Sequence, residues 1–340
     1  MQSSQSNSEH GLLLTCLSVR RNVVPSVLTR CEFWFFLVFH TIVTVCYKRG
    51  LLPGAEDRRS HLGVDADFWD VLVFLAILLT VFMTQALMAK YMRLYTLTRS
   101  LFGQIMDIAL RLSMTCPQSY TRLSIRYLLG AVMLFFMETH GQLEERHWEE
   151  MQANGLLMSD EKTRLEGLGV RSERSLILLH WATDVARQGF RAGKVTNTHV
   201  TGAVNKFTQM RQAQQEMVDQ VRFTFPKLYV HLAELTLFAC LVILGYSMAL
   251  TMSIWGTVAY FTLLFVFLGL VELGNQLQNP FGDDEIDFPM ARWLQDVAEH
   301  VATLVECERP SKDSGLDDGP LQHQLKGFPQ AFDIDMDMDM

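Results

Sequence analysis

An uncharged run extends from Leu235 to Val271 and contains no Asp, Glu, Lys or Arg. A helix that crosses a bilayer needs about 20 mostly apolar residues, so this run is long enough for two such helices. We expect the break between them in the more polar segment Ser247–Gly256. Two further uncharged runs, Phe33–Tyr47 and Val71–Ala89, lie nearer the N-terminus. The chain is therefore predicted to be an all-α, four-span membrane protein; the alternative, a soluble helical protein with buried hairpins, rarely contains such runs.

The charges around these runs predict their orientation. Arg20, Arg21 and Arg30 lie close enough to the first run to hold that flank on the cytosolic side. The first loop, Lys48–Asp67, has as many acidic as basic side chains and is the expected outside loop. Both termini are then expected to be cytosolic, or stromal in a plastid.

The predicted spans divide the chain into six segments, and the segments outside the membrane are predicted to be cytosolic and largely helical. We expect an N-terminal arm (1–31), two spans (32–99), a cytosolic helical bundle (100–224), two further spans (225–274), an acidic turn with a helix (275–309) and a disordered acidic tail (310–340). The expected helices outside the uncharged runs are Asp67–Arg99, Arg122–Met137, Ser159–Gly167, Arg174–Arg187, Thr198–Gln220 and Met290–Cys307. Ser159 is the expected N-cap of its helix, and Gly189 the expected stop after Arg187.

The sequence carries no pattern that indicates an enzyme. The six cysteines are scattered, with no paired spacing for zinc or for a disulfide framework. His140 and His147 lie near acidic residues, but no zinc-binding motif supports a metal site there. Nucleophile elbows and Gly-rich phosphate loops are also missing from the sequence. The basic residues of the middle region have no accompanying aromatic stripe, so a nucleic-acid partner is not expected.

A short polar and acidic string follows directly on the last uncharged run. It extends from Asn275 to Phe288, and four acids crowd into residues 283–287. Pro280 cannot donate a backbone hydrogen bond, so the preceding helix should end here and free its last carbonyl groups. Hard cations such as Ca²⁺ bind six to eight oxygen ligands of this kind. The spacing is not that of an EF-hand, and a solvated acidic loop is the alternative.

The Asn-Pro-Phe-Gly sequence at 279–282 with the acids that follow, placed after a membrane span, resembles the calcium clasp of the bestrophin family of anion channels. The resemblance implies four calcium ligands from this chain: the carboxylates of Asp284 and Asp287 and the carbonyls of Gln276 and Asn279. A neighbouring subunit's N-terminal arm would supply a further carbonyl. Here Ile286 interrupts the acidic run that animal members have.

Phe74, Leu78 and Phe82 recur at every fourth position and share one helix face. From this spacing alone, ordinary packing is the expectation. The bestrophin resemblance implies instead that they form the neck of a pore on the axis of a homopentamer. Three stacked apolar rings can dewet and stop ion flow. The family's Trp-rich segment after this helix is absent, since the sequence continues as Lys90 to Tyr95.

A second constriction is implied near the start of the helix Thr198–Gln220. Lys194 to Thr198 aligns with the segment that forms the cytosolic aperture in the family, and counting back from Pro226 places Thr198 at the aperture. Val200 is the alternative.

The resemblance implies a passive anion channel that passes chloride and bicarbonate, gated by Ca²⁺. A non-conducting membrane scaffold with the same fold and a secondary anion transporter are the alternatives. The expected location is the plasma membrane, with an organelle membrane such as the thylakoid as the alternative.

Overall fold

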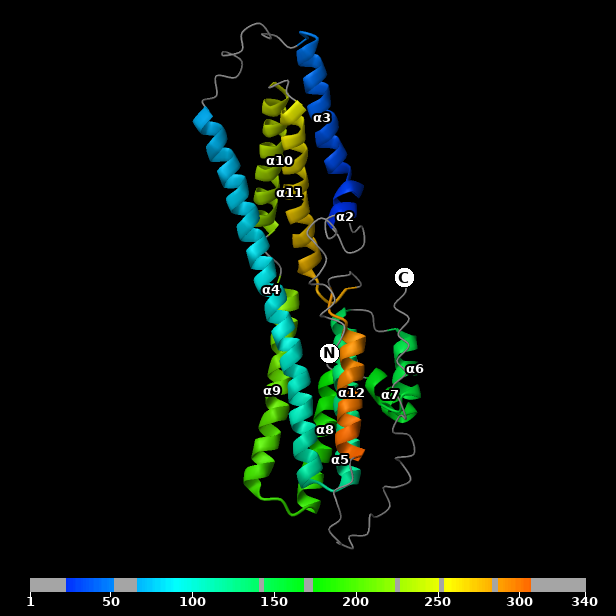
Figure 1. Ribbon diagram of the computed structural model, residues 1–340. Helices are drawn as coiled ribbons and strands as arrows, with labels where there is room; N and C mark the ends of the chain where they lie inside the picture. The colour runs from blue at the N-terminus through cyan, green and yellow to red at the C-terminus, as the bar shows by residue number, and fades with distance from the viewer. Residues whose placement is uncertain are drawn as a thin grey trace, which may run out of the picture. The chain divides into compact units, whose positions relative to one another are not determined.

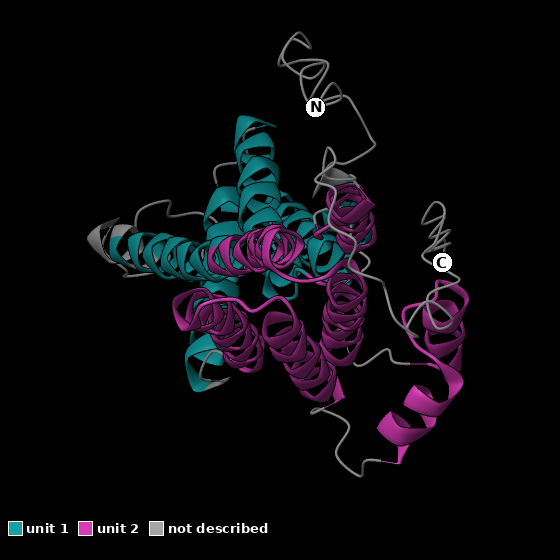
Figure 2. Ribbon diagram, turned by 90° about the horizontal axis from the view of Figure 1, so that it is seen from below, with its two compact units in different colours: residues 1–92, 223–280, 284–286 teal, residues 93–222, 281–283, 287–340 magenta. Residues whose placement is uncertain are grey.

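The computed structural model describes residues 23–51, 66–140, 144–167, 174–223, 227–250, 254–282 and 287–306. All regular structure in these ranges is helical. The chain divides into two compact units (Figure 2). Unit 1 comprises residues 1–92, 223–280 and 284–286, and unit 2 comprises residues 93–222, 281–283 and 287–340. The expected disordered tail and most of the N-terminal arm lie outside the described residues.

Unit 1 contains five described helices or parts of helices, four of which are long and apolar enough to cross a membrane. They are α2 (Val23–Thr29), α3 (Cys31–Lys48), the first part of α4 (Ala66–Thr115), α10 (Lys227–Leu250) and α11 (Ile254–Gln278). Figure 1 shows α10 and α11 side by side, with α3 packed against both. The prediction that the long uncharged run forms two helices is confirmed, because α10 ends at Leu250 and α11 begins at Ile254.

A buried histidine joins the three packed helices of unit 1. His40 of α3 donates from Nδ1 to the carbonyl of Gly245 at 2.9 Å, and its Nε2 lies 3.2 Å from the Thr257 hydroxyl. The Tyr260 ring stacks on the imidazole at 4.8 Å between centroids. A Cβ at Gly245 would lie 2.6 Å from the Tyr260 hydroxyl oxygen, so glycine permits this close approach. His40 thus has partners on α10 and α11, as a polar group buried among apolar helices requires.

Unit 2 is built around α5 (Gln118–His140). Its other helices are the second part of α4, α6 (Glu145–Ala153), α7 (Ser159–Glu166), α8 (Arg174–Ala192), α9 (Asn197–Arg222) and α12 (Met290–Glu306). Helix α5 packs mainly against α8 and also against α12. It is one of five described helices long and apolar enough to cross a membrane, but 72% of its apolar window is buried inside the protein. A helix whose apolar stretch is mostly covered by other parts of the protein is a core helix.

Helix α8 does not stop at Gly189, so that prediction was wrong. The helix continues to Ala192, and Gly189 faces α5. A Cβ at Gly189 would lie 2.8 Å from the Cβ of Tyr120 and 3.1 Å from the sulfur of Cys116. The glycine is therefore needed for close helix packing rather than for termination.

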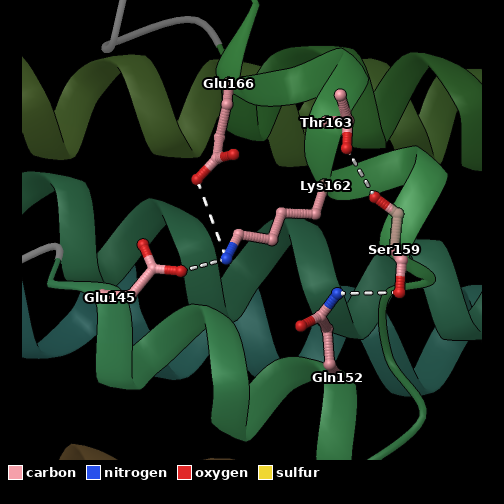
Figure 3. Close-up of polar contacts among 6 residues, drawn as sticks. All are labelled: Glu145, Gln152, Ser159, Lys162, Thr163 and Glu166. Atoms are coloured by element: carbon pink, nitrogen blue, oxygen red, sulfur yellow. Dashed lines mark hydrogen bonds and ion pairs between the residues drawn. The ribbon is translucent and has the colours of Figure 1, made fainter.

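Glu161, not Ser159, caps the N-terminus of α7. The N-cap residue is Met158, whose backbone N–H donates to Glu161 Oε2 at 2.8 Å. Ser159 is the first helical residue, and its hydroxyl accepts a hydrogen bond from Gln152 of α6 (Figure 3). Lys162 on the same turn pairs with Glu145 and, at 3.9 Å, with Glu166. These contacts join α6 and α7 into a small helical pair.

Candidate functional site

Helix α4 has two distinct faces within unit 1. Ala76, Thr80 and Leu87 are buried against the unit. At about 100° per residue, Phe74, Leu78 and Phe82 lie on the opposite side of the helix. Their side chains are 63%, 36% and 54% exposed, respectively. The structure therefore places the three expected neck residues in one exposed apolar stripe, which we call the α4 stripe.

The described parts of the chain cover the α4 stripe only in part. Three large apolar side chains left exposed at one-turn spacing are unusual in a soluble helix, where such a stripe faces the core. A protomer alone cannot enclose a channel with a single helix face. Further copies of the chain are therefore needed if the stripe lines a pore.

The end of α11 leaves backbone oxygens available for a cation. The helix ends at Gln278, as Pro280 predicted. Pro280 has no N–H to donate to the carbonyl of Gln276 four residues earlier, so that oxygen lacks its helical partner. Asn279 follows the helix and is exposed. Both predicted carbonyl ligands, Gln276 and Asn279, thus belong to a helix terminus in unit 1.

The two predicted carboxylate ligands are described to different degrees. Asp284 lies outside the described residues. Asp287 is half-buried just before α12, in unit 2. Carbonyl and carboxylate oxygens are the ligand types that Ca²⁺ prefers, so the donor chemistry fits the ion. Within the described ranges no three His, Cys, Asp or Glu side chains gather into a metal-binding group. A complete shell therefore requires Asp284 and oxygens from outside the described residues.

An aromatic cluster holds the two ends of the acidic turn in unit 2. Phe281 and Phe288 contact each other at 5.5 Å between ring centroids, and Phe288 stacks on Trp293 of α12 at 5.6 Å. Tyr95 of α4 contacts Phe288 and Trp293, both at 5.8 Å. The residues that flank the predicted calcium ligands therefore pack directly on the helix that carries the α4 stripe. Sequence reasoning missed this cluster, although phenylalanines on both sides of the acids were a signal for it.

Glu272 connects the end of α11 to the start of α3. Its Oε2 lies 2.5 Å from Nη2 of Arg30, and its Oε1 accepts a hydrogen bond from the Gln276 side chain at 3.2 Å. Arg30, which directly precedes α3, is thus held beside one predicted calcium ligand within unit 1.

The predicted aperture residues lie at the start of α9. Thr198 is exposed in the first turn and Val200 is half-buried. Further along, Lys206 of α9 pairs with Asp107 of α4 at 2.9 Å, and Arg93 Nε of α4 donates to Glu216 of α9 at 2.9 Å. Both pairs lie in unit 2, so α9 is fixed along the second part of α4.

Comparisons with known proteins agree on one family. A family model described as "Bestrophin, RFP-TM, chloride channel" matches residues 3–306. A solved bacterial bestrophin homologue from Klebsiella pneumoniae, carrying one substitution, is similar with a TM-score of 0.71 and 12% identity over 84% of this chain and 98% of that chain. A second variant of the Klebsiella pneumoniae protein gives a TM-score of 0.70 and 13% identity over 81% of this chain and 98% of that chain. At such identities the structures establish the fold. No curated protein matches the chain.

Proposed function

This chain belongs to the bestrophin family of chloride channels, and on that premise we propose that it forms a homopentamer that passes chloride and bicarbonate passively under the control of Ca²⁺. The observation that carries the proposal is the α4 stripe of Phe74, Leu78 and Phe82, exposed on the protomer. Anion flux from liposomes that contain the purified protein tests the proposal. A channel gives anion efflux without a coupled ion, and a scaffold gives no flux. A transporter gives a flux that saturates as the anion concentration rises.

Four helices would cross the bilayer in this proposal. These are α3, the first part of α4, α10 and α11, whose apolar windows are only 17–33% buried inside the protein. Helix α5 would remain in the cytosol as the core of unit 2, because its window is largely covered by its neighbours. Because other helices cover most of the apolar surface of α5, little of that surface is left to contact lipid.

The neck would consist of five copies of the α4 stripe around the pentamer axis. Rings of Phe and Leu side chains in a narrow pore exclude water, so an ion would have to shed hydration without receiving new ligands. A small movement of α4 that widens the rings would restore water and conduction. The positive edges of Phe74 and Phe82 would favour anions over cations there.

Calcium would be held by the carbonyls of Gln276 and Asn279 and the carboxylates of Asp284 and Asp287, with an N-terminal carbonyl of a neighbouring subunit. The bound ion would supply a double positive charge that holds these oxygens together. An acidic turn fixed by Ca²⁺ would hold Phe281 and Phe288 in place, and their ring contacts would in turn restrict the position of Tyr95 on α4. A ligand shifts a two-state equilibrium only by its difference in affinity between the states, so the clasp must be better formed in the open channel.

Asp284→Ala is expected to shift the calcium concentration for half-maximal current upward by about tenfold or more, since a lost charged ligand weakens the site by over 1.4 kcal/mol. Asp283→Ala removes the same charge from an adjacent position and serves as the matched control. Patch-clamp recording over a calcium series measures both. Unaltered calcium sensitivity in Asp284→Ala, or an equal shift in the control, would remove Asp284 from the mechanism.

The aperture would be formed by Thr198. Its exposure at the start of α9, compared with the half-buried Val200, supports Thr198 as the residue that faces the pore. A ring of five hydroxyl groups is more hydrated than an aliphatic ring and hence less selective. Thr198→Val is therefore expected to increase severalfold the permeability ratios between different anions, which are measured as reversal potentials under anion substitution. The same variant should carry a smaller current. Val200→Thr is the paired variant; a change in selectivity there, with none in Thr198→Val, would move the aperture to Val200.

The membrane is proposed to be the plasma membrane, with an organelle membrane such as the thylakoid as the alternative.

A further inference from the structure

A polar cavity in unit 2 shares no lining residue with the α4 stripe, the proposed clasp or the proposed aperture. Its volume is about 270 Å³, and its walls come from α5, α8 and α9. This is near the lower limit of about 300 Å³ for small-molecule sites. Its apolar wall is formed by Phe135, Leu176, Val218 and Val221.

Gln214 of α9 lines the cavity and carries its clearest indication of a ligand. The residue is only 2% exposed. Neither its amide nitrogen nor its amide oxygen has a hydrogen-bond partner among the described residues. Burial of an amide is unfavourable unless both groups are hydrogen-bonded, so a molecule in the cavity would remove this cost.

Glu138 of α5, a half-buried residue whose Oε1 is buried, is the second polar group of the cavity wall without a full set of partners. Its Oε1 also lacks a partner within the described part of the chain. Burial raises the pKa of Glu138 to about 7, although the charge of Arg174 and hydrogen bonds from Ser175 act to lower it. Near neutral pH this carboxyl is therefore partly protonated, and in that state it can donate a hydrogen bond to a ligand.

Two exposed arginines of α9 complete the polar wall. Arg211 and Arg222 line the same cavity as Gln214 and lie on the same side of α9. The wall also contains the hydroxyl groups of Ser175 and Thr139. The Thr139 hydroxyl already donates to the Phe135 carbonyl at 2.7 Å, so the arginines and Gln214 are the main donors left for a ligand. The two arginines outweigh the single carboxyl of Glu138, and the balance of charge is most positive when Glu138 is protonated.

We propose that this cavity binds a small organic carboxylate, with its charged end on Arg211 or Arg222, a polar group on Gln214 and its carbon chain against the apolar wall. Charge-assisted hydrogen bonds from guanidinium are the strongest interactions available to a carboxylate. None of its residues belongs to the proposed neck, clasp or aperture, so succinate binding can be tested separately from conduction.

Succinate and its neutral analogue succinamide test the proposal by calorimetric titration of the purified full-length protein. Succinate is expected to bind saturably, and succinamide at least about tenfold more weakly because it forms no ion pair. Arg211→Gln or Arg222→Gln, whichever removes the arginine that holds the carboxylate, should weaken succinate binding about tenfold, and so should Gln214→Leu. Gln209→Leu, an exposed position of the same helix, is the matched control and should leave binding unchanged.

The pH dependence of succinate affinity, measured by the same calorimetric titration, is a second test of the proposal. Succinate affinity should rise between pH 8 and pH 6, because Glu138 of α5 loses its negative charge while Arg174 of α8 and Arg211 and Arg222 of α9 keep their positive charge. Glu138→Gln should abolish this rise.

Gln214→Leu also has a readout that does not require a ligand. Without succinate, its melting temperature should equal or exceed that of the unaltered protein, since a buried unpartnered amide has been removed. Absence of saturable succinate binding, or equal binding by succinamide, would overturn the proposal. Loss of the oligomer in Gln214→Leu would also overturn it, by assigning the cavity to a contact between copies of the chain.

Discussion

Replacing Phe74, Leu78 and Phe82 together by alanine is expected to raise calcium-free anion flux at least about tenfold, which requires the barrier at the neck to fall by only about 1.4 kcal/mol. Alanine side chains leave a wider and more hydrated passage, so the closed state would no longer exclude water. The measurement is chloride efflux from liposomes that contain purified protein and a calcium chelator. The same variant should have lost most of its response to added calcium.

A matched variant tests the proposed pore-lining role of the α4 stripe against other exposed residues of the same helix. Ile77, Val81 and Met88 are also exposed on this helix, but they lie to one side of the α4 stripe. Their joint replacement by alanine should leave calcium-free flux at its original low level. If this control leaked and the stripe variant did not, the stripe would face lipid or another subunit.

Glu161→Ala is expected to destabilise unit 2 by about 3–5 kcal/mol, the usual cost of removing one partner of a buried ion pair. The Glu161 carboxylate accepts hydrogen bonds from Arg126 at 2.6 Å and from the Tyr127 hydroxyl at 2.5 Å. It also caps α7 through the Met158 N–H. The substitution would leave the buried Arg126 guanidinium without its counter-charge. Chemical denaturation of the purified protein, followed by tryptophan fluorescence, measures the loss.

Glu145→Ala is the control for this prediction. Glu145 also pairs with a cation, Lys162, but at an exposed position on the surface of α6 (Figure 3). Exposed pairs contribute little to stability, so the unfolding midpoint should hardly change. Equal losses in the two variants would show that Glu161 acts only through general charge, not through its buried partners.

The membrane helices could be predicted because hydrophobic length is a local property of the sequence. The boundaries of α10 and α11 follow from one uncharged run and a polar break. Helix α4 was expected to end at Arg99 but continues to Thr115. Leu101, Ile105, Ile108 and Leu112 are buried at helical spacing beyond that point. No proline occurs between Arg99 and Thr115, so the sequence has no strong helix breaker there. Packing of the buried face in unit 2 stabilises the additional turns.

Features that depend on distant segments could not be predicted from periodicity. The partners of His40 are about 200 residues away in the sequence. Gly189 looked like a helix stop by local rules, yet contact with α5 decides its role. The cavity around Gln214 arises only when α5, α8 and α9 come together. The calcium clasp could be proposed from the sequence because its residues are nearly contiguous, whereas the contacts of Tyr95 with Phe288 and Trp293 could not.

The most direct test of the pore is the accessibility of single cysteines placed along α4 in a background without the six native cysteines. Leu78→Cys lies in the α4 stripe, and its neighbour Ile77→Cys lies beside it. A small negatively charged methanethiosulfonate, applied to open channels, should block current through Leu78→Cys and spare Ile77→Cys, with chloride slowing the reaction. Block at Ile77→Cys with none at Leu78→Cys would contradict the assignment of the α4 stripe to the ion pathway.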